Sequence, residues 1–315
     1  MKTSLISVVI PTYNAERKKD LLQCLDSLSQ QKFQDLEIVL VVEESIALLN
    51  DLKQYFEHSQ IKHRIIFSKG IKGISYARNL GVRNCSGEII AFTDDDAVLP
   101  PEWATMLLET FNQHPEAIGV TGRVIPLWVG GSQDWLPKSL YWMIGCTGWR
   151  DSEYVRETNI AAGVNMAFRA DTFNLLKFRE DLGAGAQSSG KMWFPNEDND
   201  FAIHVTSITR KPIIYNPRVI VFHKVYPHRL SYRYIRKYAF WQGAAEARYS
   251  VTWYSKRRLA TRVAVFRQLL LEFFVSDTSR KRTGIGMKMR LYLFTLFFLT
   301  AGYVTYFLRI HRYNQ

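Results

Sequence analysis

The sequence contains few cysteines, and the three that it has (Cys24, Cys85 and Cys146) form no CxxC pair. Their spacing excludes a cysteine zinc site and a disulfide framework, and it favours a reducing compartment. The 315 residues also contain no internal repeat and no low-complexity segment. The first apolar run ends after about seven residues at Pro11, which argues against a signal peptide.

The sequence has fewer acidic than basic residues: 29 aspartates and glutamates against 41 lysines and arginines, which gives a net charge of +12. Such an excess predicts an anionic partner, which could be nucleic acid, an anionic membrane surface or a phosphorylated substrate. Hydrophobic residues make up 47% of the chain, a share that excludes an intrinsically disordered protein and allows a large buried core.

Strand-like and helix-like segments alternate from the N-terminus to about residue 120. The apolar runs predict strands at residues 5–10, 36–42, 63–68 and 88–93, with helices at 20–31, 46–58, 73–85 and 101–115. This alternation predicts an α/β fold whose parallel sheet is covered by helices on both faces. Open sheets of this kind bind ligands outside the carboxyl ends of their strands.

Three consecutive aspartates, Asp94, Asp95 and Asp96, follow the strand predicted at residues 88–93. One interpretation is a solvated loop in which Asp96 caps a helix. The other is a divalent-metal site that holds a phosphorylated ligand, because Mg²⁺ and Mn²⁺ prefer hard oxygen ligands. A glycine-containing loop also leads into the helix that carries Arg78, and both helix N-termini and arginines favour phosphate.

Four segments together resemble the family 2 glycosyltransferases of GT-A fold. These segments are residues 6–28, 37–45, 74–96 and 193–205, and their order and spacing match over residues 4 to 225. The resemblance implies a GT-A catalytic domain at 1–225, with a Rossmann-like, mostly parallel sheet, and leaves a helical C-terminal region at 226–315. It also implies inverting transfer of a sugar from a UDP-, GDP- or dTDP-linked donor.

The resemblance places the nucleobase against Pro11, Tyr13 and Glu43 and the nucleotide against Arg78. The family usually has two aspartates where Glu43 and Glu44 stand, so the identity of the base stays open. Taken alone, the short stretch around Pro11 and Tyr13 favours a plain turn.

The aspartate triplet gains roles from the same resemblance. Asp94 and Asp95 are expected beside the donor, and Asp96 is expected to bind Mn²⁺ or Mg²⁺. His223, at another apparent strand end, matches a histidine that completes the metal coordination in some enzymes of this fold; the alternative is a hydrogen-bonded structural histidine. A bound cation would neutralise the leaving diphosphate.

The resemblance makes Asp198 the catalytic base and Glu197 an acceptor contact, since an inverting displacement needs a carboxylate close to the attacking hydroxyl. The alternative is that these acids merely suit the dipole of a helix N-terminus. Gly163 and Asn165 match a stretch that shapes the donor-sugar pocket. The QxxRW helix of processive members is missing around Trp241, which favours single transfer over polymer synthesis.

Residues 291–308 form an uncharged run of 18 residues between Arg290 and Arg309. A spanning helix needs about 20 apolar residues, so the run could span a membrane, lie in its interface or pack as a core helix against residues 263–275. Its basic flanks and tyrosines favour membrane contact. We therefore expect the cytoplasmic face of a membrane, with peripheral, monotopic or single-span attachment.

The expected activity is that of a membrane-associated, metal-dependent glycosyltransferase with a lipid-linked or envelope-glycan acceptor. A catalytically silent nucleotide-sugar-binding or scaffold protein of the same fold is the main alternative. A nucleic-acid binder is suggested by the mixed Arg, Tyr and Trp content of residues 229–258. No recognition motif accompanies that mixture, and the aspartates would repel phosphate without a metal, so no nucleic-acid partner is expected.

Overall fold

The computed structural model describes residues 5–13, 15–57, 59–130, 135–148, 153–186, 194–252 and 283–313. By its internal contacts the chain divides into two compact units. Unit 1 comprises Met1–Leu127, Gly145–Thr147 and Asp151–Lys224; unit 2 comprises Trp128–Ile144, Gly148–Arg150 and Val225–Gln315. A compact unit need not fold alone, so the catalytic domain 1–225 and the helical region 226–315 stay predictions as domains.

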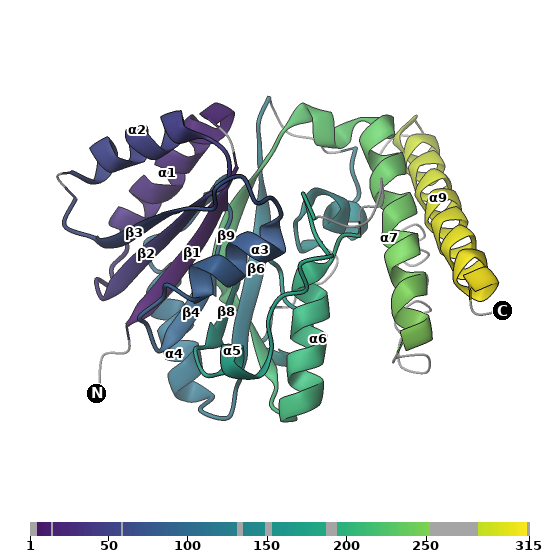
Figure 1. Cartoon of the computed structure of the whole chain (residues 1–315). Helices are drawn as coiled ribbons and strands as arrows, with labels where there is room; N and C mark the ends of the chain where they lie inside the picture. Colours follow the sequence, from purple (N-terminus) through teal and green to yellow (C-terminus); the bar gives the residue numbers. More distant parts are fainter. Residues whose placement is uncertain are drawn as a thin grey trace. The chain divides into compact units, whose positions relative to one another are not determined.

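The first half of unit 1 is a parallel sheet (Figure 1). Its strands lie in the order β3-β2-β1-β4, with bounds β1 (Ile6–Thr12), β2 (Leu36–Val42), β3 (Lys62–Phe67) and β4 (Ile89–Phe92). The connecting helices are α1 (Lys18–Ser29), α2 (Ile46–Phe56) and α3 (Ile74–Val82). Right-handed crossovers put α1 and α2 on one face and α3 on the other, because the chain moves outward to β3 and returns to β4. The predicted α/β fold is confirmed.

Strand β1 continues through Pro11, although the sequence predicted that proline to end it. Pro11 and Thr12 pair with Val41 and Val42 of β2. The carbonyl of Thr12 points toward β2, where it accepts a hydrogen bond from the amide of Glu43. Because the backbone groups of successive strand residues point in opposite directions, the nitrogen of Pro11 points toward β4. On that side β4 pairs with β1 only as far as Val9. The proline therefore costs no ladder hydrogen bond.

The second half of the sheet makes it a mixed sheet. Its strands are β5 (Ala97–Val98), β6 (Gly119–Trp128), β7 (Arg156–Thr158), β8 (Met166–Arg169) and β9 (Ile213–Val225). From β4 the order continues β8-β6-β9-β5, with β7 beside β9. The pairs β4–β8, β6–β8, β5–β9 and β7–β9 are antiparallel. Of these strands, the sequence indicated only β9, through the apparent strand end at His223.

An aromatic cluster fixes the helix that carries the predicted base. Helices α4 (Trp103–Gln113), α5 (Thr172–Leu175) and α6 (Glu197–Thr209) complete unit 1. Phe201 of α6 is 1% exposed and packs on Phe178 at a ring-centroid distance of 4.4 Å and on Phe173 at 5.3 Å. Because Phe92 of β4 and Phe168 of β8 belong to the same core, the start of α6 is held beside the sheet.

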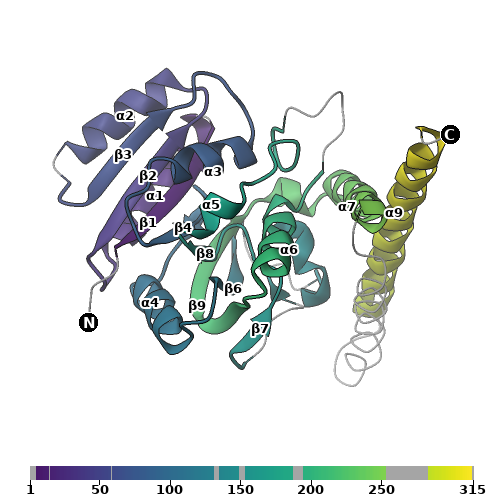
Figure 2. The same cartoon turned by 60° about the horizontal axis from the view of Figure 1, so that its bottom comes forward.

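Unit 2 contains two long helices that lie side by side (Figures 1 and 2). Its elements are the 3₁₀ turns η2 (Lys138–Ile144) and η4 (Pro227–Leu230) and the helices α7 (Tyr232–Thr252) and α9 (Thr283–Tyr313). Two glycines allow the close approach: a Cβ on Gly243 would lie 1.9 Å from the Leu299 carbonyl oxygen, and one on Gly302 would lie 1.8 Å from that of Phe240.

Helix α9 contains the uncharged run. Among the described residues it is long and apolar enough to cross a membrane over Arg290–Arg309, with a mean hydropathy of 1.7. Only 17% of that stretch is buried, a low share for a core helix. Residues 263–275, the partner considered for a core helix, lie outside the described part of the chain.

Candidate active site

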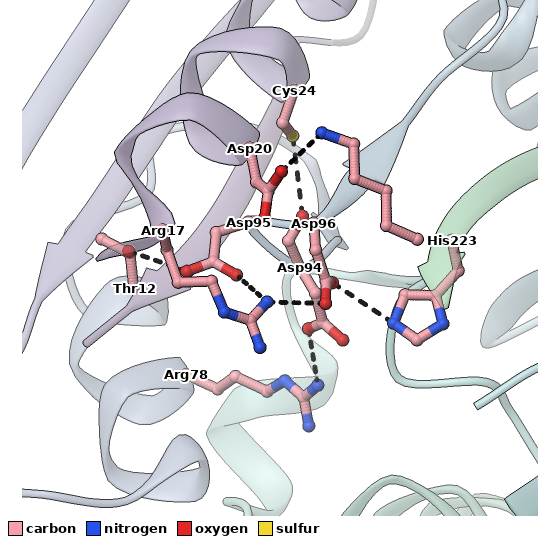
Figure 3. A network of polar contacts seen from close by, with 10 residues as sticks. Thr12, Arg17, Asp20, Cys24, Arg78, Asp94, Asp95, Asp96 and His223 are labelled. Carbon is pink, nitrogen blue, oxygen red and sulfur yellow. Dashed lines mark hydrogen bonds and ion pairs between the residues drawn. The ribbon is translucent and has the colours of Figure 1, made fainter. Parts of the chain in front are cut away.

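The carboxyl ends of β1 and β4 meet where the strand order reverses, the position at which open α/β sheets bind ligands. Thr12 ends β1, and its hydroxyl donates a 2.8 Å hydrogen bond to Oδ2 of Asp95 (Figure 3). Asp95 is only 5% exposed. Burial, followed by the charge of Asp96, raises the pKa of Asp95 to about 7. Asp95 thus points into the protein and joins the two strand ends.

Asp94 and Asp96 form a cluster with His223 (Figure 3). The short β5–β9 ladder places His223 opposite Ala97, so Nε2 of His223 lies 3.2 Å from Oδ1 of Asp96. One ligand atom from each of Asp94, Asp96 and His223 lies within 4.8 Å of the others. Two carboxylates and an imidazole at this separation fit a divalent cation.

Arg17 is a basic residue of this site that the sequence did not predict. It ends the 3₁₀ turn η1 (Ala15–Arg17), and its Nη1 lies 2.6 Å from Oδ2 of Asp96 and 3.2 Å from Oδ1 of Asp95. Burial lowers the pKa of Arg17, but the charges of Asp96 and Asp95 outweigh it and raise the pKa above its ordinary value. A permanent positive charge therefore lies against the triplet.

A buried ion pair ties the first helix to the last strand beneath the triplet. Nζ of Lys224 lies 2.7 Å from Oδ1 of Asp20 in α1, and the amide of Lys224 donates to the carbonyl of Asp96 at 3.0 Å. The thiol of Cys24 donates to the carbonyl of Asp94 at 3.6 Å. These contacts hold the triplet and the strand end of His223 together, and sequence reasoning assigned no role to Lys224 or Asp20.

Arg78 connects the triplet to the predicted catalytic acids. Its side chain is 1% exposed, and its guanidinium lies 2.8 Å from Oε1 of Glu197 and 3.4 Å from Oδ1 of Asp94. Burial raises the pKa of Glu197; the charge of Arg78 opposes this and that of Asp198 adds to it, and the net shift is upward. The arginine predicted to contact the nucleotide thus lies between the two groups of acids.

Asp198 is positioned from two sides at the start of α6. Its Oδ2 accepts a 2.8 Å hydrogen bond from the amide of Gly163, and its Oδ1 accepts one of 2.7 Å from the amide of Asn199. A Cβ on Gly163 would lie 2.7 Å from Nη2 of Arg78 and 3.1 Å from Oδ2 of Asp198. A side chain at this position would therefore displace the Arg78 guanidinium from its place beside Asp198. The residue before α6, Asn196, has a left-handed φ of 76°, a conformation that asparagine tolerates better than most residues.

The other predicted donor contacts differ in accessibility. Tyr13 is 47% exposed, whereas Glu43 is buried, and that burial raises its pKa. Asn165 is fully buried: its amide donates to the carbonyls of Arg123 and Val219, and its Oδ1 accepts from the Trp103 indole. These contacts give Asn165 a structural role, and its contact with the donor sugar stays a prediction.

Residues 7–179 match the family model described as Glycosyl transferase family 2, which is more than half of the chain. The chain belongs to glycosyltransferase family 2. The resemblance seen in the sequence is thereby confirmed, and the protein is a glycosyltransferase. The matched residues include the aspartate triplet and Arg78 but end before Asp198 and His223.

Similar curated proteins carry glycosyltransferase names. The glucosyl-dolichyl phosphate glucuronosyltransferase of Haloferax volcanii is 29% identical over 239 residues, which cover 76% of this chain and 75% of that protein. Glycosyltransferase GlyA of Streptococcus pneumoniae serotype 4 is 32% identical over 116 residues, or 36% of this chain and 16% of that protein.

Solved structures with the same fold include two that contain Mn²⁺. The mannosyltransferase PcManGT from Pyrobaculum calidifontis, in complex with GDP-Man and Mn²⁺, has a TM-score of 0.62 at 16% identity over 96% of this chain and 87% of that one. GalNAc-T7 with UDP, GalNAc and Mn²⁺ has a TM-score of 0.55 at 14% identity, covering 78% of this chain and 51% of that one. At these identities the likeness establishes the GT-A fold.

Proposed function

We propose that the protein transfers a sugar, with inversion, from a nucleoside-diphosphate sugar to a lipid-linked acceptor. The observation that carries this proposal is the single buried guanidinium of Arg78, which contacts Glu197 on one side and Asp94 on the other. It places the proposed acceptor contact Glu197, which directly precedes the proposed base Asp198, next to the proposed diphosphate site, and a direct displacement needs acceptor and donor side by side. Tyr13 and Glu43 flank the proposed nucleotide.

Asp94, Asp96 and His223 are the proposed ligands of a divalent cation. Two carboxylates suit both Mg²⁺ and Mn²⁺, while the imidazole favours Mn²⁺, the more nitrogen-tolerant of the two. When bound, the cation supplies Lewis-acid stabilisation of the negative charge on the leaving diphosphate. The ion pair between Lys224 and Asp20, together with the hydrogen bond from the Lys224 amide to the Asp96 carbonyl, helps to hold these ligands in place.

Asp198 is the proposed base that takes the proton from the attacking acceptor hydroxyl. The Gly163 amide fixes one of its oxygens and the Asn199 amide the other, so the carboxylate is oriented before the acceptor arrives. Glu197 is the proposed acceptor contact, held by Arg78.

The proposed acceptor is a sugar or phosphate carried on a polyprenyl lipid. The Haloferax volcanii relative is named for a glucosyl-dolichyl phosphate substrate, and the mostly exposed apolar stretch of α9 provides a surface for membrane contact. The proposed site of action is the cytoplasmic face, where nucleotide sugars are made. A peripheral, monotopic or single-span attachment through α9 would bring the enzyme to such a lipid.

The experiment that tests this function combines ligand binding with transfer. Thermal unfolding is recorded with UDP, GDP and dTDP in the presence of Mn²⁺ or Mg²⁺, and again with EDTA; a ligand that binds the folded state raises the melting temperature. The nucleotide that stabilises the protein selects the labelled donor, and transfer is measured as label entering the lipid extract. Stabilisation that EDTA abolishes, together with labelled lipid, is the expected result.

The Asp198→Asn variant separates an enzyme from a catalytically silent scaffold. Asparagine can still accept from the Gly163 amide, so folding and nucleotide stabilisation should persist while transfer falls by about 10²–10⁴-fold. Nucleotide binding without any transfer by the unaltered protein would support the scaffold instead. Loss of binding and transfer together in the unaltered protein would contradict both.

A further inference from the structure

Arg17 and the proposed metal site share one carboxylate. Oδ2 of Asp96 lies 2.6 Å from Nη1 of Arg17, while Oδ1 of the same group lies 3.2 Å from His223. Arg17 comes from the loop between β1 and α1, whereas the other members of the cluster come from the end of β4 and from β9. Its side chain is 18% exposed, so it can change partner more freely than the buried Arg78.

A guanidinium and a divalent cation on the same carboxylate oppose each other. Both need the negative charge of Asp96, and two positive groups a few ångströms apart repel one another when solvent is largely excluded. Asp96 is 2% exposed, so water screens this repulsion poorly. A metal that takes Asp96 must therefore weaken the contact with Arg17.

The released guanidinium has a second anionic partner within the proposed reaction. Arg17 lies with its guanidinium carbon 5.7 Å from the centre of the Tyr13 ring, on the side where the nucleotide is proposed. A diphosphate carries planar pairs of oxygens that a guanidinium binds in two-point fashion. Binding of the diphosphate would therefore give the Arg17 guanidinium a new anionic partner in place of Asp96.

We propose that Arg17 is a positioning residue that couples metal binding to nucleoside-diphosphate binding: it competes with the cation for Asp96 and turns to the diphosphate when both ligands are present. This inference rests on the proposed function, since it requires that function's metal and its donor. Its consequence is that the cation alone binds weakly and becomes firmly held once the nucleotide is there.

The test is a comparison of Mn²⁺ affinity in the full-length protein, the Arg17→Gln variant and the Lys18→Gln variant. Lys18 is the matched control, because it is the next residue, carries the same charge and pairs with Asp51 outside the site at 2.8 Å. The free Mn²⁺ concentration is followed by electron paramagnetic resonance at pH 8, first with Mn²⁺ alone and then with UDP, GDP or dTDP. This readout does not depend on turnover.

Arg17→Gln should bind Mn²⁺ alone about tenfold more tightly than the unaltered protein, because one charge-assisted contact no longer has to be broken. The factor by which the nucleotide tightens Mn²⁺ binding should shrink in Arg17→Gln and stay unchanged in Lys18→Gln. Equal or weaker Mn²⁺ affinity in Arg17→Gln, or an unchanged nucleotide factor, would overturn the role of Arg17 while leaving the metal site in place. Absence of Mn²⁺ binding in all three proteins would instead overturn the metal site, and this inference with it.

Discussion

Arg78 is buried and pairs with two carboxylates, Asp94 and Glu197. Replacing it with an uncharged residue would leave both carboxylates without this positive partner. Arg78→Met should lower the free energy of unfolding by about 3–5 kcal/mol, because Glu197 and Asp94, whose side chains are 12% and 29% exposed, stay in place and lose their shared cation. Urea unfolding measures the change, and the control is Arg83→Met, at the exposed residue that directly follows α3.

Adding Glu197→Gln to Arg78→Met should restore part of that stability, since it removes one of the uncompensated charges. If the double variant were no more stable than Arg78→Met, the acids would not be the cause of the loss.

Glu37 forms a second buried network at the amino ends of the strands, where Ser7, Ser86 and Arg64 donate to it. Burial alone would raise the pKa of Glu37, but these hydrogen bonds outweigh it and lower the pKa below 4.5. A lowered carboxyl pKa stabilises the fold above the unfolded-state pKa, and the stabilisation is lost as the pH falls through the folded-state value.

Glu37→Gln should therefore lower the melting temperature at pH 7, through a loss of about 1–3 kcal/mol for a charged hydrogen-bonded group. The gap to the unaltered protein should narrow as the pH falls below the unfolded-state pKa and close once it has passed the lowered folded-state pKa of Glu37, because the group is then protonated in both states. Melting curves recorded from about pH 3.5 to 7 test this. The control variant Glu57→Gln, at an exposed position, should show no such gap. A gap independent of pH would contradict the charge argument.

The triplet and Asp198 could be singled out from the sequence because acids that follow a buried strand, or open a helix within a recognised motif, stand out locally. Arg17 could not, since it lies in a run of charged residues that is typical of any solvated helix start. Asp20 and Lys224 are 204 residues apart, and no local pattern pairs them. Asn165 lies in a matching stretch, yet its contacts depend on three distant segments.

Among the elements, β1, β2 and β4 were predictable because each is a mostly apolar run that is buried along nearly its whole length, whereas β3 is apolar only over residues 65–67. Of the antiparallel strands, β5 and β7 were not predictable, because β5 has two residues and β7 has three, too few for a periodic signal. These short strands owe their form to the neighbours they pair with, and β5 decides where His223 lies.

The glycines between α7 and α9 give a prediction about that helix pair. Gly302→Ala should destabilise unit 2 by about 1–3 kcal/mol, because the added methyl overlaps the Phe240 carbonyl and forces the helices apart. Gly286→Ala is the matched control on the same helix, since a Cβ there meets nothing within 4 Å; it should stabilise by up to about 1 kcal/mol through helix propensity. Thermal unfolding in detergent, followed by tryptophan fluorescence, compares them, and similar shifts in both variants would contradict the close packing.

For the whole molecule, the prediction concerns membrane binding. Leu293 and Phe297 on α9 are 58% and 65% exposed, and basic residues flank the stretch. Replacing both with glutamate should reduce flotation with anionic liposomes at least about tenfold, because apolar area is lost and negative charge is added. The control carries Ile46→Glu and Ile208→Glu, at similarly exposed apolar positions of unit 1. Equal loss in both proteins would exclude α9 as the specific contact.

The long span between Asp20 and Lys224 also has a consequence for the order of assembly during synthesis. A growing chain that has emerged as far as residue 179 already contains the parallel strands and all three aspartates, yet it lacks both His223 and the lysine that neutralises Asp20. Closing so long a loop is slow compared with forming neighbouring strands and helices. The candidate active site is therefore completed last, when β9 inserts into a sheet that is already largely built, and capture of the proposed metal would report that final step.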